Sequence, residues 1–145
     1  MLIAIIGENC TGKSTLAEAI AAKNSAGIIT GKDYLRMAKS PDEAARLFKQ
    51  KLSDSVSGEN LIYVISEKEH LAFLPEGTVK VLVTAELDTI KERFRARMRG
   101  ILPAPVEAML ERKHGMFDEG EYRLRFHSGR DDAQSAVDAL VGSAE

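Results

Sequence analysis

The sequence predicts a three-layer α/β fold, in which helices cover both faces of a parallel β-sheet. The first observation is that short apolar and β-branched runs alternate with helical stretches along the 145 residues. The second is that three of the first four runs lack strict in/out alternation, which is typical of strands covered by helices on both faces. A fifth run alternates and is expected at a sheet edge. The predicted strands are Leu2–Ile6, Gly27–Thr30, Leu61–Ile65, Val79–Thr84 and Tyr122–His127.

Helical stretches connect these strands. Because parallel strands cannot be joined by tight hairpins, the helices predict right-handed crossovers. Pro41 is expected to break the second helix. The third helix carries one apolar stripe that is expected to pack on the sheet. The stripe comprises Leu87, Ile90, Phe94 and Met98. The predicted helices are Lys13–Lys23, Tyr34 to about Ser55, Glu86–Arg99, Val106 to about Phe117, and Asp131–Val141.

Length and composition indicate one domain over residues 1–145, with 44% hydrophobic residues. Twenty basic and 22 acidic side chains give a formal charge of -2, so the chain lacks the basic excess of a nucleic-acid-binding protein. No apolar run approaches the length of a membrane span, and no membrane partner is expected. Cys10 is the only cysteine, which suits a reducing, cytoplasmic location. Monomer and homodimer both remain open.

The segment between the first strand and the first helix matches the Walker A pattern. It reads Gly7-Glu8-Asn9-Cys10-Thr11-Gly12-Lys13-Ser14, and Thr15 follows. Glycines allow the backbone amides to turn inward, and the helix start adds its own unpaired amides, so the segment is expected to bind the phosphates of ATP or GTP. Lys13 is expected to reach the β- and γ-phosphates, and Ser14 to bind Mg²⁺.

The chain resembles the P-loop kinase superfamily, in the branch of nucleoside monophosphate, shikimate and gluconate kinases. The resemblance rests on the phosphate loop, on Thr30–Arg36 after the second strand, and on the arginine-rich helix Asp88–Arg99. It implies a P-loop NTPase fold with five parallel strands in the order 2-3-1-4-5. A short lid at about 97–113 resembles that of shikimate or gluconate kinases. The third strand continues into Ser66-Glu67, without the Asp-Gly-Phe-Pro-Arg sequence of adenylate kinases, so the acceptor stays open.

Five further side chains are candidates for the site. Arg93 and Arg97 lie four residues apart on one helix flank, where they could clamp a triphosphate. Asp33 is expected to orient an acceptor hydroxyl and take its proton, whereas Arg36 would hold an acceptor that already carries a phosphate. Glu67 could hold a water of the Mg²⁺ shell.

These features predict an ATP-dependent phosphotransferase that acts on a small metabolite or a nucleoside monophosphate. Lys13, Asp33 and Arg97 are its expected catalytic residues, with ATP or GTP and Mg²⁺ as cofactors. The alternative is a nucleotide-binding switch or slow NTPase that has no small-molecule acceptor. Acceptor-stimulated release of ADP would distinguish the two.

Overall fold

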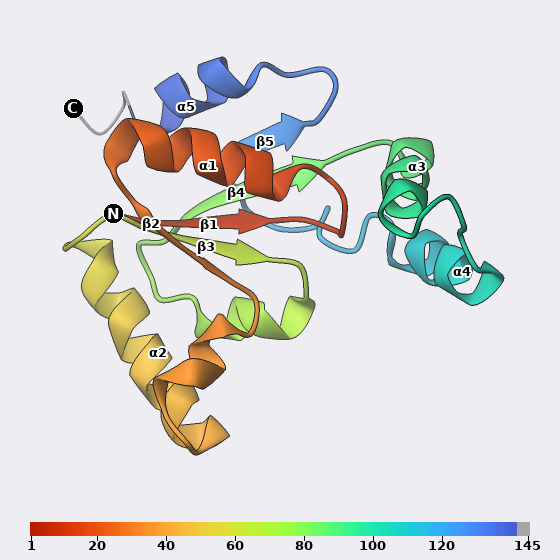
Figure 1. Ribbon diagram of the computed structural model, residues 1–145. Coiled ribbons are helices and arrows are strands. Elements are labelled where there is room, and N and C mark those ends of the chain that lie inside the picture. The colour runs from red at the N-terminus through yellow and green to blue at the C-terminus, as the bar shows by residue number, and fades with distance from the viewer. Residues whose placement is uncertain (142–145) are drawn as a thin grey trace.

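A computed structural model describes residues 1–141 of the chain and contains one five-stranded parallel sheet (Figure 1). The strand order is β2-β3-β1-β4-β5, which confirms the expected topology. The fifth strand lies at an edge, as its alternation predicted. The strands are β1 (Leu2–Ile6), β2 (Gly27–Thr30), β3 (Leu61–Ile65), β4 (Val79–Thr84) and β5 (Leu124–His127).

Helices lie on both faces of the sheet and at its carboxyl end (Figure 1). The α-helices are α1 (Lys13–Asn24), α2 (Pro41–Val56), α3 (Leu87–Arg97), α4 (Ala104–Lys113) and α5 (Ala133–Val141). Two 3₁₀ helices, η1 (Asp33–Met37) and η2 (Lys68–Phe73), follow β2 and β3. Within residues 1–141, no helix is long and apolar enough to cross a membrane.

Strand β1 occupies the centre of the sheet, and its two faces pack against helices on opposite sides. Its odd-numbered residues Ile3 and Ile5 pack in a cluster with α1 and α5, whereas its even-numbered residues pack in a cluster with α2. All five residues of β1 are therefore buried, and the run shows no polar alternation. The register pairs Ile6 with Ile65 at the end of β3 and with Leu82 of β4, and β4 continues for two residues beyond this point.

The break at Pro41 is confirmed. η1 ends at Met37, and α2 begins at Pro41, where proline is tolerated because the first helical turn leaves its amides unpaired. Ser40 caps the new helix, since its Oγ accepts a hydrogen bond from the Glu43 amide at 3.3 Å. The crossover from β2 to β3 therefore consists of two separate helices, the five-residue η1 and the 16-residue α2.

The apolar stripe of α3 does not pack on the sheet, so that expectation was wrong. Ile90 and Phe94 instead pack with Leu110 of α4 and with Cys10 of the loop after β1. Met98 remains 37% exposed. An apolar stripe identifies the face that needs covering, but not the element that covers it. Residues 87–113, which include α3 and α4, are called the α3–α4 arm below.

Helix α4 ends earlier than the sequence indicated. It stops at Lys113 because Gly115 adopts a positive φ of 81°, which ends helical geometry. Phe117, which was expected at the end of this helix, lies beyond it and packs in the core cluster on the α2 face of the sheet. The turn at Gly115 brings the chain back from the α3–α4 arm to the loop after β1.

Candidate functional site

The loop between β1 and α1 has a backbone that only its own residue types accommodate. A Cβ on Gly7 would lie 2.4 Å from the carbonyl oxygen of Val83 in β4, so the loop passes against the neighbouring strand. Gly12 has a φ of 99° and Cys10 a φ of 66°, both in the left-handed region. These conformations turn the chain sharply before α1 begins at Lys13. The loop therefore lies at the carboxyl end of the sheet, where open α/β folds bind ligands.

Lys13 is buried beneath this loop, with 6% of its surface exposed. Its ammonium donates a hydrogen bond to the carbonyl oxygen of Glu8, which also accepts one from Thr11 Oγ1 at 3.0 Å. The pKa of Lys13 is lowered from 10.5 to about 8, mainly by burial and to a smaller extent by the Arg97 guanidinium, against the opposing effects of Cys10 and Glu8. An ammonium has three hydrogens, so one bond to Glu8 leaves two for an anion.

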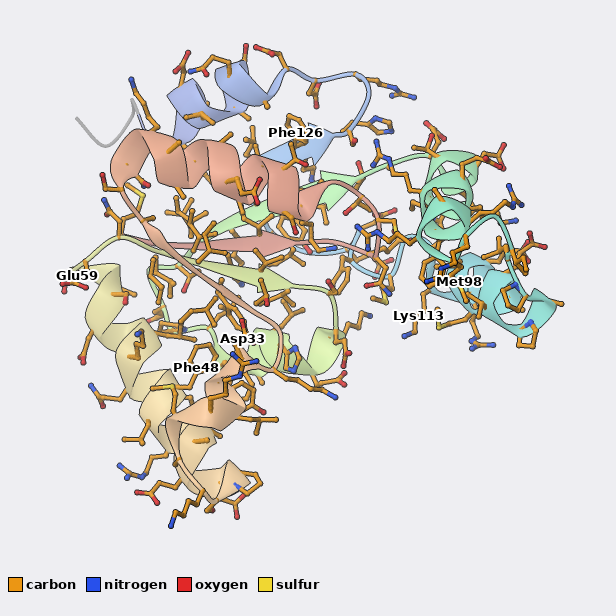
Figure 2. All side chains as sticks on the ribbon, in the orientation of Figure 1. Asp33, Phe48, Glu59, Met98, Lys113 and Phe126 are labelled. Atoms are coloured by element: carbon orange, nitrogen blue, oxygen red, sulfur yellow. The ribbon has the colours of Figure 1, made fainter. Side chains whose placement is uncertain are left out.

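Two cavities open on either side of the loop. The cavity on the β5 side has a volume of about 440 Å³ and is lined by the loop, α3 and the turn after β5. The cavity on the β2 side has a volume of about 390 Å³ and is lined by the loop, the end of β2 and Ser66. Figure 2 shows Phe126 and Asp33, which line the respective cavities, on opposite sides of β1. We call them the β5-side and β2-side cavities.

Arg97 lines both cavities, whereas Arg93 lines only the β5-side cavity. Arg93 bridges two segments, because its guanidinium donates to the Cys10 carbonyl oxygen at 3.0 Å and to Ser128 Oγ at 2.9 Å. Among residues 1–141, the Arg97 side chain has no hydrogen-bond or ion-pair partner, and its charge lowers the pKa of Lys13. Two cations that face a common space favour an anion between them.

Asp33 lies on the rim of the β2-side cavity, at the start of η1. Its Oδ2 accepts hydrogen bonds from the Thr30 amide at 3.1 Å and from Thr30 Oγ1 at 2.9 Å. These two bonds lower the pKa of Asp33, so its carboxylate is ionised at neutral pH. Lys32 lines the same cavity, but Arg36 does not. The structure thus brings Asp33 to the site together with Lys13 and Arg97, and leaves Arg36 exposed on η1.

Of the two residues expected to bind Mg²⁺, Ser14 lines the β2-side cavity and Glu67 does not. Ser14 is exposed and lines the β2-side cavity beside Lys13, as a hydroxyl ligand of phosphate-bound Mg²⁺ requires. Glu67 precedes η2 and does not line that cavity, although its neighbour Ser66 does. Among the described residues, no group of three or more metal-binding side chains occurs. Mg²⁺ that is carried by phosphate oxygens and water needs few protein ligands, so Ser14 fits this mode of binding.

Several residues that line the β5-side cavity were not predicted from the sequence. They come from the end of β5, the start of α5 and the turn between them, in which Gly129 has a φ of 95°. The additional lining residues there are Phe126, Ser128, Gly129, Asp131 and Ala133. A glycine turn directly after a strand was the one available signal, since parallel strands end at the ligand-binding edge of the sheet. No recognised motif covers it.

The architecture is that of the P-loop small-molecule kinases. Among similar solved structures are a gluconokinase from Sinorhizobium meliloti, with a TM-score of 0.60 and 19% identity over 98% of this chain and 90% of that one. A shikimate kinase from Bacteroides thetaiotaomicron gives a TM-score of 0.61 and 17% identity over 99% and 98%. The YorR protein of Bacillus subtilis, solved with phosphorylated GDP, gives 0.64 and 19% over 99% and 95%. No family model and no curated protein matches the sequence.

Proposed function

We propose that the protein is a Mg²⁺-dependent kinase that transfers the γ-phosphoryl group of ATP or GTP to a hydroxyl group of a small metabolite. The observation that carries this proposal is the position of Arg97, which lines both cavities next to the buried Lys13. A phosphoryl group passing from one cavity to the other would cross the space that these two cations face. Positioning and charge stabilisation supply most of the catalysis in such a reaction.

The β5-side cavity suits the nucleoside of the donor. Its volume of about 440 Å³ falls within the usual range of small-molecule sites. The triphosphate would then lie along residues 7–15, with backbone amides, Lys13 and Arg97 around it. Ser14 would bind the Mg²⁺ that the phosphates carry, and Glu67 could hold one of its waters from the end of β3. Arg93 supports this side of the site through its bonds to Cys10 and Ser128.

The β2-side cavity favours a hydroxyl acceptor over a phosphate acceptor. Asp33 is an ionised carboxylate on its rim, which can accept a hydrogen bond from a hydroxyl and then its proton. Arg36, which was expected to hold an acceptor phosphate, does not line the cavity. The acceptor oxygen would attack the γ-phosphorus, the bond from that phosphorus to the β-phosphate oxygen would break, and Asp33 would take the hydroxyl proton.

The proposal is tested by measuring ADP release from Mg-ATP with a panel of sugars, sugar acids, shikimate and nucleoside monophosphates. A hydroxyl acceptor is expected to stimulate release. Asp33→Asn should lower kcat by about 100-fold or more and leave Mg-ATP affinity unchanged, because the amide cannot take the proton. Asp42→Asn, at an exposed aspartate of α2, is the control. Slow release that no acceptor alters would contradict the kinase and support a nucleotide-binding switch or slow NTPase.

A further inference from the structure

Glu8 is an unusual residue in the phosphate loop, because its carboxylate is buried. The residue is 8% exposed, and both carboxylate oxygens have partners from a distant part of the chain. Oε1 lies 3.0 Å from His114 Nδ1, and Oε2 accepts a hydrogen bond from the Gly115 amide at 3.0 Å. Both partners lie directly after α4, more than 100 positions away in sequence. The end of the α3–α4 arm is therefore bonded to the loop.

The backbone of Glu8 contacts a different partner, Lys13. Its carbonyl oxygen accepts hydrogen bonds from the Lys13 ammonium and from Thr11 Oγ1. One residue thus holds the end of the arm with its side chain and the key ammonium with its backbone. A displacement of the His114–Gly115 turn would move the Glu8 side chain, and with it the carbonyl group that orients Lys13.

The α3–α4 arm is held together by an ion pair and is connected to the loop in two places. Lys91 of α3 forms an ion pair with Glu111 of α4 at 2.6 Å, so the two helices are joined. Arg93 of α3 holds the Cys10 carbonyl oxygen, and the turn after α4 holds Glu8. Figure 2 shows Met98 and Lys113 on this arm, beside the carboxyl end of the sheet. The arm therefore has a direct mechanical connection to residues 8–13.

If Glu8 acted only through its own charge, it would be expected to weaken phosphate binding. A buried carboxylate is costly unless hydrogen bonds satisfy it, and next to a phosphate site it repels the ligand. If repulsion were its main effect, removing Glu8 would strengthen nucleotide binding. If its contact with the arm holds the loop and Lys13 in place, removing it would weaken binding. The two explanations give opposite signs.

We propose that Glu8 is a positioning residue, whose contact with His114 and Gly115 couples the α3–α4 arm to Lys13. The inference rests on the proposed function, in which the triphosphate binds along residues 7–15. Through this contact, the position of the arm sets the position of the Glu8 carbonyl group and of the Lys13 ammonium, and an ordered loop holds the arm in place.

The first test is a calorimetric titration of Mg-ATP into the wild type, Glu8→Ala, His114→Ala and the double variant. Each single change is expected to weaken binding about tenfold, the usual effect of losing a charge-assisted hydrogen bond. The double variant should bind no more weakly than Glu8→Ala alone, because Glu8→Ala already removes the contact with His114 together with the hydrogen bond from the Gly115 amide. Glu119→Ala, at an exposed glutamate five residues after His114, is the matched control and should bind like the wild type.

The second test needs no nucleotide and measures amide hydrogen exchange. His114→Ala should speed exchange about tenfold at residues 8–13, and Glu8→Ala should do so at residues 104–115. His114 is a surface side chain with 36% exposure, so its replacement is expected to preserve the fold even if Glu8→Ala does not. A merely structural role of His114 would alter exchange only around its own turn.

The outcomes separate this inference from the proposed function. Tighter or unchanged Mg-ATP binding in Glu8→Ala and His114→Ala would overturn the positioning role. Multiplied effects in the double variant would also overturn it. If the wild type itself fails to bind Mg-ATP, the proposed function is refuted, and hydrogen exchange alone decides whether the arm and the loop are coupled. Unchanged exchange at residues 8–13 in His114→Ala would then reject the coupling.

Discussion

Replacing Lys13 with methionine is expected to stabilise the nucleotide-free protein. Lys13 is 6% exposed, and burial lowers its pKa from 10.5 to about 8. Since one pKa unit corresponds to about 1.4 kcal/mol, the charged side chain costs the folded state about 3 kcal/mol. Methionine keeps an unbranched apolar side chain but loses the hydrogen bond to the Glu8 carbonyl oxygen, which offsets about 1 kcal/mol. The expected gain in the free energy of unfolding is about 2 kcal/mol at pH 7.

The effect has a defined dependence on pH. Because folding lowers the pKa of Lys13, the unfolded chain binds more protons than the folded protein between about pH 8 and pH 10.5, and the stability of the wild type rises across this window. The advantage of Lys13→Met should therefore be full below pH 8 and mostly lost at pH 10. Urea unfolding of both proteins at pH 7 and pH 10 measures it. Two results would contradict this prediction. One is a Lys13→Met protein that is less stable than the wild type at pH 7, and the other is a difference in unfolding free energy that is the same at pH 7 and pH 10.

Three further predictions concern the loop and the fold. Gly7→Ala should cost about 3 kcal/mol of unfolding free energy because its Cβ would lie 2.4 Å from the Val83 carbonyl oxygen, whereas Gly27→Ala, with a Cβ 3.7 Å from Leu61 Cδ1, should cost less than about 0.5 kcal/mol. Equal losses in urea unfolding would contradict this steric argument. Mg-ATP binding at pH 8 should take up about half a proton at Lys13, because phosphate raises its lowered pKa. Calorimetry in two buffers of different ionisation enthalpy would show this uptake, and identical heats would exclude it. Ser40→Ala should lower the unfolding free energy by about 1 kcal/mol through loss of the α2 cap, and an unchanged urea midpoint would argue against the cap.

The parts of the protein that sequence analysis predicted well depend on residues that are close together in the chain. The phosphate loop is one contiguous pattern between a strand and a helix, and the sheet order followed from the resemblance that this pattern carries. Pro41 marked the break before α2 because its ring and missing amide act locally. Asp33 comes three residues after Thr30, the last residue of β2, and it therefore lies near the carboxyl end of that strand, where it lines the β2-side cavity.

The parts that sequence analysis could not predict depend on long-range contacts. The stripe of α3 gave the direction of an apolar face, but only the fold shows that Leu110 of α4 covers it. Glu8 and His114 lie 106 positions apart, and neither side chain signals its partner. Asp33 and Arg36 lie three residues apart on η1, which is one turn of a 3₁₀ helix, yet only Asp33 lines the cavity. A side chain's direction at a short 3₁₀ helix depends on packing that residue spacing alone does not specify.

Binding of a nucleoside triphosphate by the loop from Gly7 to Ser14 can be measured by calorimetric titration of the folded wild-type protein with Mg-ATP and Mg-GTP. Saturable heat from at least one of them, together with a raised melting temperature in the same buffer, is the predicted result. If neither nucleotide produces heat or changes the melting temperature, the loop does not bind a nucleoside triphosphate.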